Sequence, residues 1–139
     1  MLSTVETIYT PDFTIICECP VPYDAISAGY PSDGYGHIEE YLDLNQHFIK
    51  NPVSTFFLRV AGTSMINASI FPGDILIVDK SLDAVDKNVV IGIVNEEFTV
   101  KRYRNINGNA FLMDEKGGDE VKYEFFELWG VVTASIRTL

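Results

Sequence analysis

Short apolar runs separated by turn-forming residues fill the chain after residue 54. We interpret Thr55–Ala61 as a strand whose side chains alternate between two faces, whereas residues 75–78 and Val89–Val94 are almost continuously apolar. Alternation with period two is typical of a strand buried on one face, and a short continuous run is typical of a strand buried on both. Further strand-like runs cover residues 98–103, 111–113, 121–126 and 128–136. This spacing predicts a mainly β domain with curled or packed antiparallel sheets.

Turn residues between these runs predict how some strands connect. Asn95-Glu96 separates two predicted strands, and Asn107-Gly108 separates the next two. Asn-Gly is a strong hairpin signal because both residues tolerate positive φ. Lys-Gly-Gly-Asp at residues 116–119 marks a further turn.

The first part of the chain has a different pattern, and we expect residues 1–24 to form a mobile N-terminal arm. Residues 13–17 are apolar enough for a strand. Three prolines bracket that segment, so the strand would be short or at a sheet edge; they are Pro11, Pro20 and Pro22. Residues 25–36 contain three glycines, one proline and two serines, which is typical of a mobile connector.

One short helix is expected after the connector. Asp43 and Gln46 have the spacing of a capping box, and Leu44 and Phe48 share a helical face. Asn51-Pro52 would end the helix. Its length is then roughly two turns.

The composition is typical of a single globular domain and disfavours direct binding to nucleic acid. The 139 residues are 47% hydrophobic and include nine Phe, seven Tyr and one Trp, enough for a substantial core. The net charge is −10, and the one tight cationic cluster is Lys101, Arg102 and Arg104. Direct nucleic-acid binding is disfavoured, because it depends on Lys and Arg displacing counterions.

No targeting or membrane-spanning segment is evident, and we expect a cytoplasmic protein. Residues 1–10 lack a basic start, and no apolar stretch approaches transmembrane length. The two cysteines, Cys17 and Cys19, are too close in sequence for an ordinary structural disulfide framework.

Ser64 and Lys101 are the candidate catalytic pair. Ser64 follows a predicted strand in Gly62-Thr63-Ser64-Met65, and Lys101 lies inside a later predicted strand. A serine becomes a good nucleophile when a base takes its proton, and a lysine can be that base only when neutral. Burial can lower a lysine pKa by as much as about 3–5 units. Gly62 permits a tight strand exit, which would let nearby amides face a developing oxyanion.

Less specific interpretations of this pair remain open. A serine in a glycine turn is usually structural. Strand alternation places Thr99, Lys101 and Tyr103 on one face, and periodicity alone predicts that this face is exposed to solvent.

Other catalytic or metal-binding arrangements are weaker. A Ser-His-Asp triad would need His37, in the connector, or His47, on the predicted helix. Cys17-Glu18-Cys19 resembles half of a metal site, but no second pair of Cys or His residues completes it. We therefore interpret both cysteines as ordinary thiols. We expect Asp74 and Asp79 to end a strand rather than form an acid/base pair. No glycine-rich phosphate loop occurs, and no cofactor is expected.

Taken together, several segments resemble the LexA/UmuD (S24) family of self-cleaving serine proteases. The resemblance runs from about Ala28 to Leu139. The segments that carry it are residues 28–32, 42–45, 55–65, 73–79, 97–102 and 130–132. It implies that Ser64 is the nucleophile, that Lys101 is the general base, and that the chain cuts its own Ala28–Gly29 bond. Residues 1–28 would be the arm that is removed, and residues 29–139 the peptidase and dimerisation domain.

The resemblance also implies a biological role. In this family a RecA–DNA filament promotes self-cleavage during the SOS response to DNA damage. The segment before the expected cut is too short for the helix-turn-helix domain of a LexA-like repressor. That length and the acidic charge resemble the UmuD branch, whose shortened homodimer joins the Y-family polymerase UmuC in error-prone translesion synthesis.

Two other functions stay open at this point. The chain is alternatively a non-catalytic dimeric module that holds a polymerase, in which case Ser64→Ala would leave mutagenesis in cells unaltered. The second alternative is a protease that acts on other proteins, like the signal peptidases that share Ser-Lys chemistry. Cleavage of a supplied peptide with the arm left intact would favour it.

Overall fold

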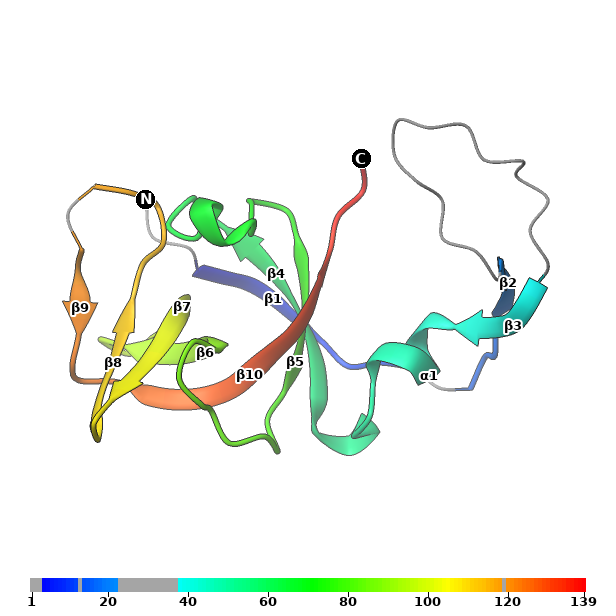
Figure 1. Cartoon of the computed structure of the whole chain (residues 1–139), viewed down its shortest axis with the longest axis horizontal. Coiled ribbons are helices and arrows are strands. Elements are labelled where there is room, and N and C mark those ends of the chain that lie inside the picture. Colours follow the sequence, from blue (N-terminus) through cyan, green and yellow to red (C-terminus); the bar gives the residue numbers. More distant parts are fainter. Residues whose placement is uncertain (1–3, 13, 23–37, 119) are drawn as a thin grey trace. The chain divides into compact units, whose positions relative to one another are not determined.

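The computed structural model describes residues 4–12, 14–22, 38–118 and 120–139 of the chain. They form two compact units: the residues up to Pro11 together with residues 51–139, and residues 12–50. The larger unit holds an eight-stranded sheet, and the smaller holds a two-stranded sheet and one short α-helix (Figure 1). The predicted mainly β fold with antiparallel sheets is therefore confirmed. Ala28 and Gly29 lie outside the described residues, so the predicted domain boundary there stays a prediction.

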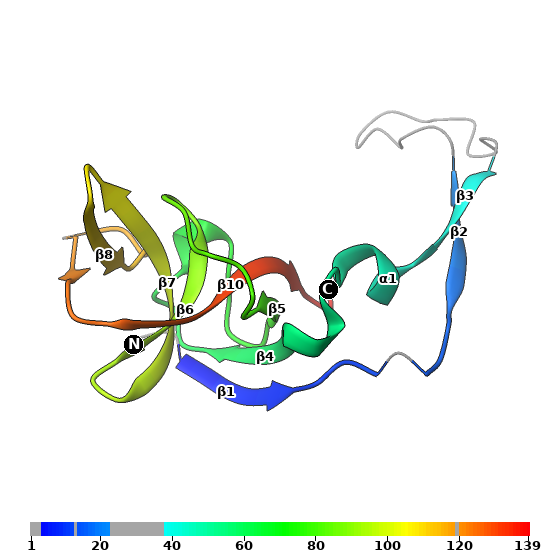
Figure 2. The same ribbon diagram turned by 90° about the horizontal axis from the view of Figure 1, so that it is seen from below.

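The larger sheet has the strand order β1-β4-β5-β10-β6-β7-β8-β9, and neighbouring strands are antiparallel. In chain order the strands are β1 (Thr4–Tyr9), β4 (Thr55–Ala61), β5 (Ile75–Asp79), β6 (Val89–Val94), β7 (Glu97–Ile106), β8 (Asn109–Met113), β9 (Lys122–Tyr123) and β10 (Glu127–Ile136). β1 lies along β4 and also pairs with β7, where Thr4 faces Thr99 (Figure 2). The strands from β1 to β7 in this order therefore close into a ring.

Apolar side chains from this ring and from the segment between β4 and β5 form the main core. β5 and β6 are the continuously apolar runs of the sequence, and most of their residues are buried because each lies between two other strands. The buried members of the main cluster are Leu58, Val60, Met65, Ile70, Leu76, Val78, Ile91 and Val100. A second cluster contains Val90, Tyr103, Leu112 and Val131.

The two predicted hairpin turns are confirmed. Asn95 and Glu96 connect β6 to β7 with φ values of 51° and 66°. Asn107 and Gly108 connect β7 to β8 with φ values of 53° and 84°. Positive φ at both central residues is the geometry that favours Asn and Gly in two-residue hairpins.

In the described part of the N-terminal region, the strands lie elsewhere than expected. β1 belongs to the larger sheet, which the expectation of a mobile arm did not anticipate. The predicted strand at residues 13–17 is wrong for residues 14–17, which are irregular. The Asp12 side chain accepts hydrogen bonds from the Thr14 backbone N–H and hydroxyl, at 2.8 and 2.7 Å. Such a local turn competes with strand pairing.

The smaller unit contains β2 (Glu18–Pro22), β3 (Ile38–Asp43) and α1 (Leu44–Phe48). Asp43 begins the helix as predicted: its carboxylate accepts the Gln46 backbone N–H at 3.1 Å. The helix has five residues and is shorter than the expected two turns. In the larger unit, two 3₁₀ turns, η1 (Pro52–Ser54) and η2 (Ile66–Ala68), flank β4.

Candidate functional site

Ser64 lies in a tight turn directly after β4. The strand ends at Ala61, and Gly62 reverses the chain with a φ of +84°, which only glycine adopts at little cost. Ser64 is then fully buried, and the neighbouring Met65 packs in the main core. The predicted tight strand exit at Gly62 is confirmed.

Lys101 lies in the middle of β7 and has 0% exposure. Thr99 and Tyr103, on the same face, are also buried. The prediction that this face is exposed to solvent is therefore wrong. The reason is that two later residues cover Lys101: Asp114, which follows β8, pairs with it, and the Tyr123 ring of β9 lies 4.9 Å from its ammonium nitrogen.

Asp114 and Glu115, which directly follow β8, contact both predicted catalytic residues. Asp114 is buried and forms an ion pair with Lys101 through its Oδ1 atom. The Glu115 backbone N–H donates to the Ser64 carbonyl oxygen at 2.8 Å, and the Glu115 carbonyl accepts the Asn67 N–H at 2.7 Å. The structure therefore brings Ser64 and Lys101 to the same two-residue segment.

Asp114 is the site residue that sequence reasoning missed, although a signal for it exists. The Asn107-Gly108 hairpin pairs Ile106 with Asn109, and the same register continues to Arg102 and Met113. One step further along this register, Asp114 comes opposite Lys101. The hairpin motif alone thus predicts a carboxylate beside the lysine.

Burial and Asp114 act on Lys101 in opposite directions. Burial is the largest influence and lowers the pKa of Lys101 below its ordinary value, whereas the hydrogen bond and the negative charge of Asp114 raise it. The positive charge of Lys116 is a further, smaller influence that lowers the pKa. The net direction is down, so at a given pH a larger fraction of this amine is neutral than in an ordinary lysine, and a general base must be neutral.

Tyr123 completes this buried polar group. Its hydroxyl lies 3.4 Å from Asp114 Oδ2. Burial raises the pKa of Tyr123, and the charge of Asp114 raises it further, so the phenol keeps its proton at neutral pH. A small cavity of about 50 Å³ lies beside this group and is lined by Lys101, Tyr123, Thr99 and Thr4 among others.

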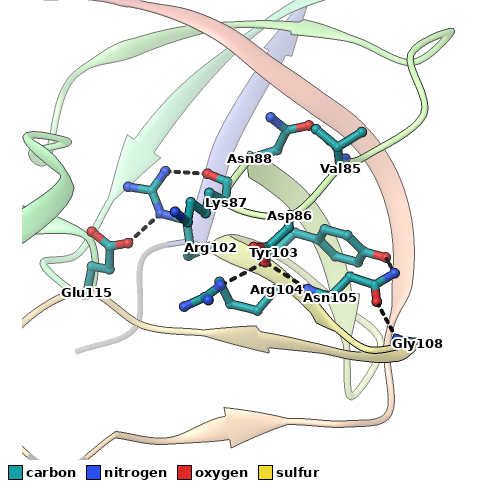
Figure 3. Close-up of polar contacts among 10 residues, drawn as sticks. All are labelled: Val85, Asp86, Lys87, Asn88, Arg102, Tyr103, Arg104, Asn105, Gly108 and Glu115. Carbon is teal, nitrogen blue, oxygen red and sulfur yellow. Dashed lines mark hydrogen bonds and ion pairs between the residues drawn. The ribbon is translucent and has the colours of Figure 1, made fainter.

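The two arginines next to Lys101 are also paired with carboxylates (Figure 3). Arg102 forms an ion pair with Glu115 and donates to the Lys87 carbonyl oxygen at 2.7 Å. Arg104 binds Asp86 at 2.8 Å. Each cation of the Lys101–Arg104 cluster therefore has an acidic partner within the protein, which reduces the positive charge available to a nucleic-acid backbone.

The candidates for other chemistries do not gather at this site. His47 lies on α1 in the smaller unit and packs edge-to-face against Phe48, whereas His37 lies outside the described residues. Cys17 and Cys19 are exposed free thiols. The pKa of Cys17 is raised, mainly by the charge of the neighbouring Cys19. Within the described ranges, no group of three or more His, Cys, Asp or Glu side chains is arranged to hold a metal ion.

Asp74 and Asp79 bind structural partners at the two ends of β5. Asp74 forms an ion pair with Arg137 at 2.7 Å. Asp79 accepts hydrogen bonds from Asn51, Ser54 and Ser81. Burial alone would raise the pKa of Asp79, but these bonds outweigh it and lower the pKa to about 2. Both carboxylates therefore stabilise the ends of the strand.

No helix in the described parts of the chain has the length and apolar character needed to cross a membrane.

Known proteins are similar to this chain over most of its length. A family model described as Peptidase S24-like matches residues 20–132. The chain is 38% identical to protein MucA of Salmonella typhimurium over 122 residues, which cover 84% of this chain and 83% of that protein. Protein SamA of Salmonella typhimurium is 36% identical over 118 residues, which cover 85% of this chain and 84% of that protein. The LexA repressor of Clostridium kluyveri is 34% identical over 112 residues, covering 81% of this chain and 55% of the repressor.

Proposed function

The chain belongs to the peptidase S24-like family of serine proteases, and from this premise we propose that it cleaves its own Ala28–Gly29 bond. Ser64 is the nucleophile and Lys101 the general base in this proposal. The observation that carries it is the full burial of Lys101 beside the segment that also binds Ser64. Burying a lysine is costly in free energy, and its lowered pKa is what base catalysis by an amine needs.

The reaction would begin when the neutral Lys101 amine takes the Ser64 hydroxyl proton. The serine oxygen attacks the Ala28 carbonyl carbon and forms a tetrahedral intermediate. The carbon–nitrogen bond then breaks, and Lys101 returns the proton to the leaving amine of Gly29. Water, deprotonated by the same lysine, hydrolyses the ester between Ala28 and Ser64. The products are residues 1–28 with a new carboxylate and residues 29–139 with a new amino terminus.

Two features of the site support slow cleavage in the isolated protein. Asp114 raises the pKa of Lys101 and so reduces the fraction of neutral amine. Ser64 is also fully buried, so the Ala28–Gly29 segment reaches it only after a local rearrangement. A RecA–DNA filament would act by favouring the conformation in which that segment is docked.

The biological setting follows from the family resemblance. We place the protein in the cytoplasm as a homodimer that takes part in the SOS response. After self-cleavage, the shortened dimer would serve as the accessory subunit of a UmuC-like Y-family polymerase in translesion synthesis. Direct contact with nucleic acid is not part of this role.

Mass spectrometry of the purified chain tests the proposal. The chain is incubated with an activated RecA filament, and separately at raised pH, where more of the lysine is neutral. We expect a product that begins at Gly29, and we expect none from Ser64→Ala or Lys101→Ala. Thr63→Ala, which changes the exposed neighbour of Ser64, is the matched control and should still be cut. Equal cleavage in Lys101→Ala, or no product from the wild type under either condition, would refute it.

A further inference from the structure

The segment before the proposed cut contributes the strands β1 and β2, and both pair with residues that follow Gly29. β1 lies along β4 through five residue pairs, from Thr4 opposite Ala61 to Tyr9 opposite Phe57 (Figure 2). β2 pairs with β3 through five more. The proposed cut breaks one peptide bond in the intervening segment and none of these pairings.

Further contacts also join residues on the two sides of the cut. In the smaller unit, the Cys17 backbone N–H donates to Asp43 Oδ2 at 2.7 Å, and the Asn45 side chain donates to the Asp12 carbonyl oxygen at 3.4 Å. In the larger unit, Thr4 pairs with Thr99 and closes the ring of strands. The fragment is therefore connected to both units.

We propose that residues 1–28 stay bound after self-cleavage as two non-covalent strands, so that cleavage and release are separate steps. This inference rests on the proposed cut at Ala28–Gly29. Addition of an extended segment to a sheet edge is a general mode of peptide binding, with main-chain hydrogen bonds supplying the affinity. Two such contacts on one fragment reinforce each other, typically by a factor of about 10²–10⁴ over either alone.

Release of the fragment would create a new binding surface. β4 has β1 on one side and β5 on the other, so loss of β1 leaves the Thr55–Ala61 edge open. An open edge of this kind accepts another extended strand.

The test separates this inference from the proposed function by making the cut independently. In a Ser64→Ala chain, the recognition sequence of a site-specific protease replaces residues 32–36, and that protease makes the cut. We expect the N-terminal fragment to co-elute with the large fragment in size-exclusion chromatography and to give the mass of the complex in native mass spectrometry. Elution of the small fragment alone would overturn the inference, whatever the wild type does by self-cleavage.

Two proline variants give a matched pair for the β1 contact. Thr7 and Ile8 are adjacent on β1 and face Arg59 and Leu58 of β4. Backbone N–H groups of successive residues point to opposite sides of a strand, so only one of the two points at β4. Of Thr7→Pro and Ile8→Pro, we therefore expect one to lower the retained fraction at least tenfold and the other to change it little. Equal retention in both variants and in the parent chain would contradict a role for β1.

Discussion

Removal of the Asp114 charge should shift the pH dependence of self-cleavage to lower pH. The Asp114 carboxylate forms an ion pair with the buried Lys101 ammonium and stabilises its charged form. Asp114→Asn keeps the size and polarity of the side chain and removes the charge. Lys101 would then lose its proton more easily, because burial still disfavours the ammonium ion.

The size of the shift can be worked from the contact. Two unit charges about 3 Å apart attract by roughly 5 kcal/mol at an effective dielectric constant of about 20. One pKa unit corresponds to about 1.4 kcal/mol, so Asp114 can raise the pKa of Lys101 by at most about four units. In proteins, an oppositely charged neighbour typically shifts the pKa of an ionisable side chain by about 1–3 units. We therefore expect the pKa of Lys101 to fall in Asp114→Asn, so that a larger fraction of the amine is neutral at pH 7.

The assay is the rate of self-cleavage of the isolated protein between pH 6 and pH 11. The variant should be cut at least several times faster than the wild type near pH 7 and at a similar rate at the alkaline end. Tyr123→Phe removes only the hydroxyl 3.4 Å from Asp114 and should leave the midpoint within about half a unit. A midpoint for Asp114→Asn that is unchanged, or moved to higher pH, would refute the electrostatic reasoning.

Two further predictions concern stability. Because the folded-state pKa of Asp79 is lowered to about 2, its hydrogen bonds stabilise the fold above pH 4, and this contribution is lost as the pH falls from about 4 to about 2. We expect a loss of about 1–2 kcal/mol, and Asp79→Asn should flatten this pH dependence in denaturant titrations. Gly130→Ala should destabilise the protein by about 1–3 kcal/mol, because the added Cβ would lie 2.6 Å from Val78 Cγ1 in the core. In the same thermal or denaturant experiments, Ser135→Ala at an exposed position of β10 should change stability by no more than about 0.5 kcal/mol. Equal effects of the two variants would contradict the packing argument.

The strands after residue 54 were largely predictable from local signals. β4 and β6 have the predicted bounds, and both hairpins follow from Asn-containing turns. These elements depend on alternation and turn chemistry between neighbours in sequence. The predicted strand at residues 121–126 is confirmed only for Lys122–Tyr123, because the chain bends at the exposed Phe125.

The burial of Lys101 was not predictable from its own strand. Alternation correctly places Thr99, Lys101 and Tyr103 on one face but gives no information about what covers that face. The residues that cover Lys101 include Asp114, after β8, and Tyr123 of β9, and their position depends on tertiary folding. β1 was missed for a related reason: it is a short strand near the start of the chain, and its partner, β4, is distant in the sequence.

The most direct test of the account is the pKa of Lys101 itself. NMR of the Ser64→Ala protein labelled with ¹³C and ¹⁵N at lysine, with Lys101→Arg to assign the signal, would follow the titration of this one amine without self-cleavage. We expect a pKa below the ordinary value of about 10.4, and a still lower pKa when Asp114→Asn is added. A Lys101 amine that titrates at or above the ordinary value in both proteins would contradict its role as the base.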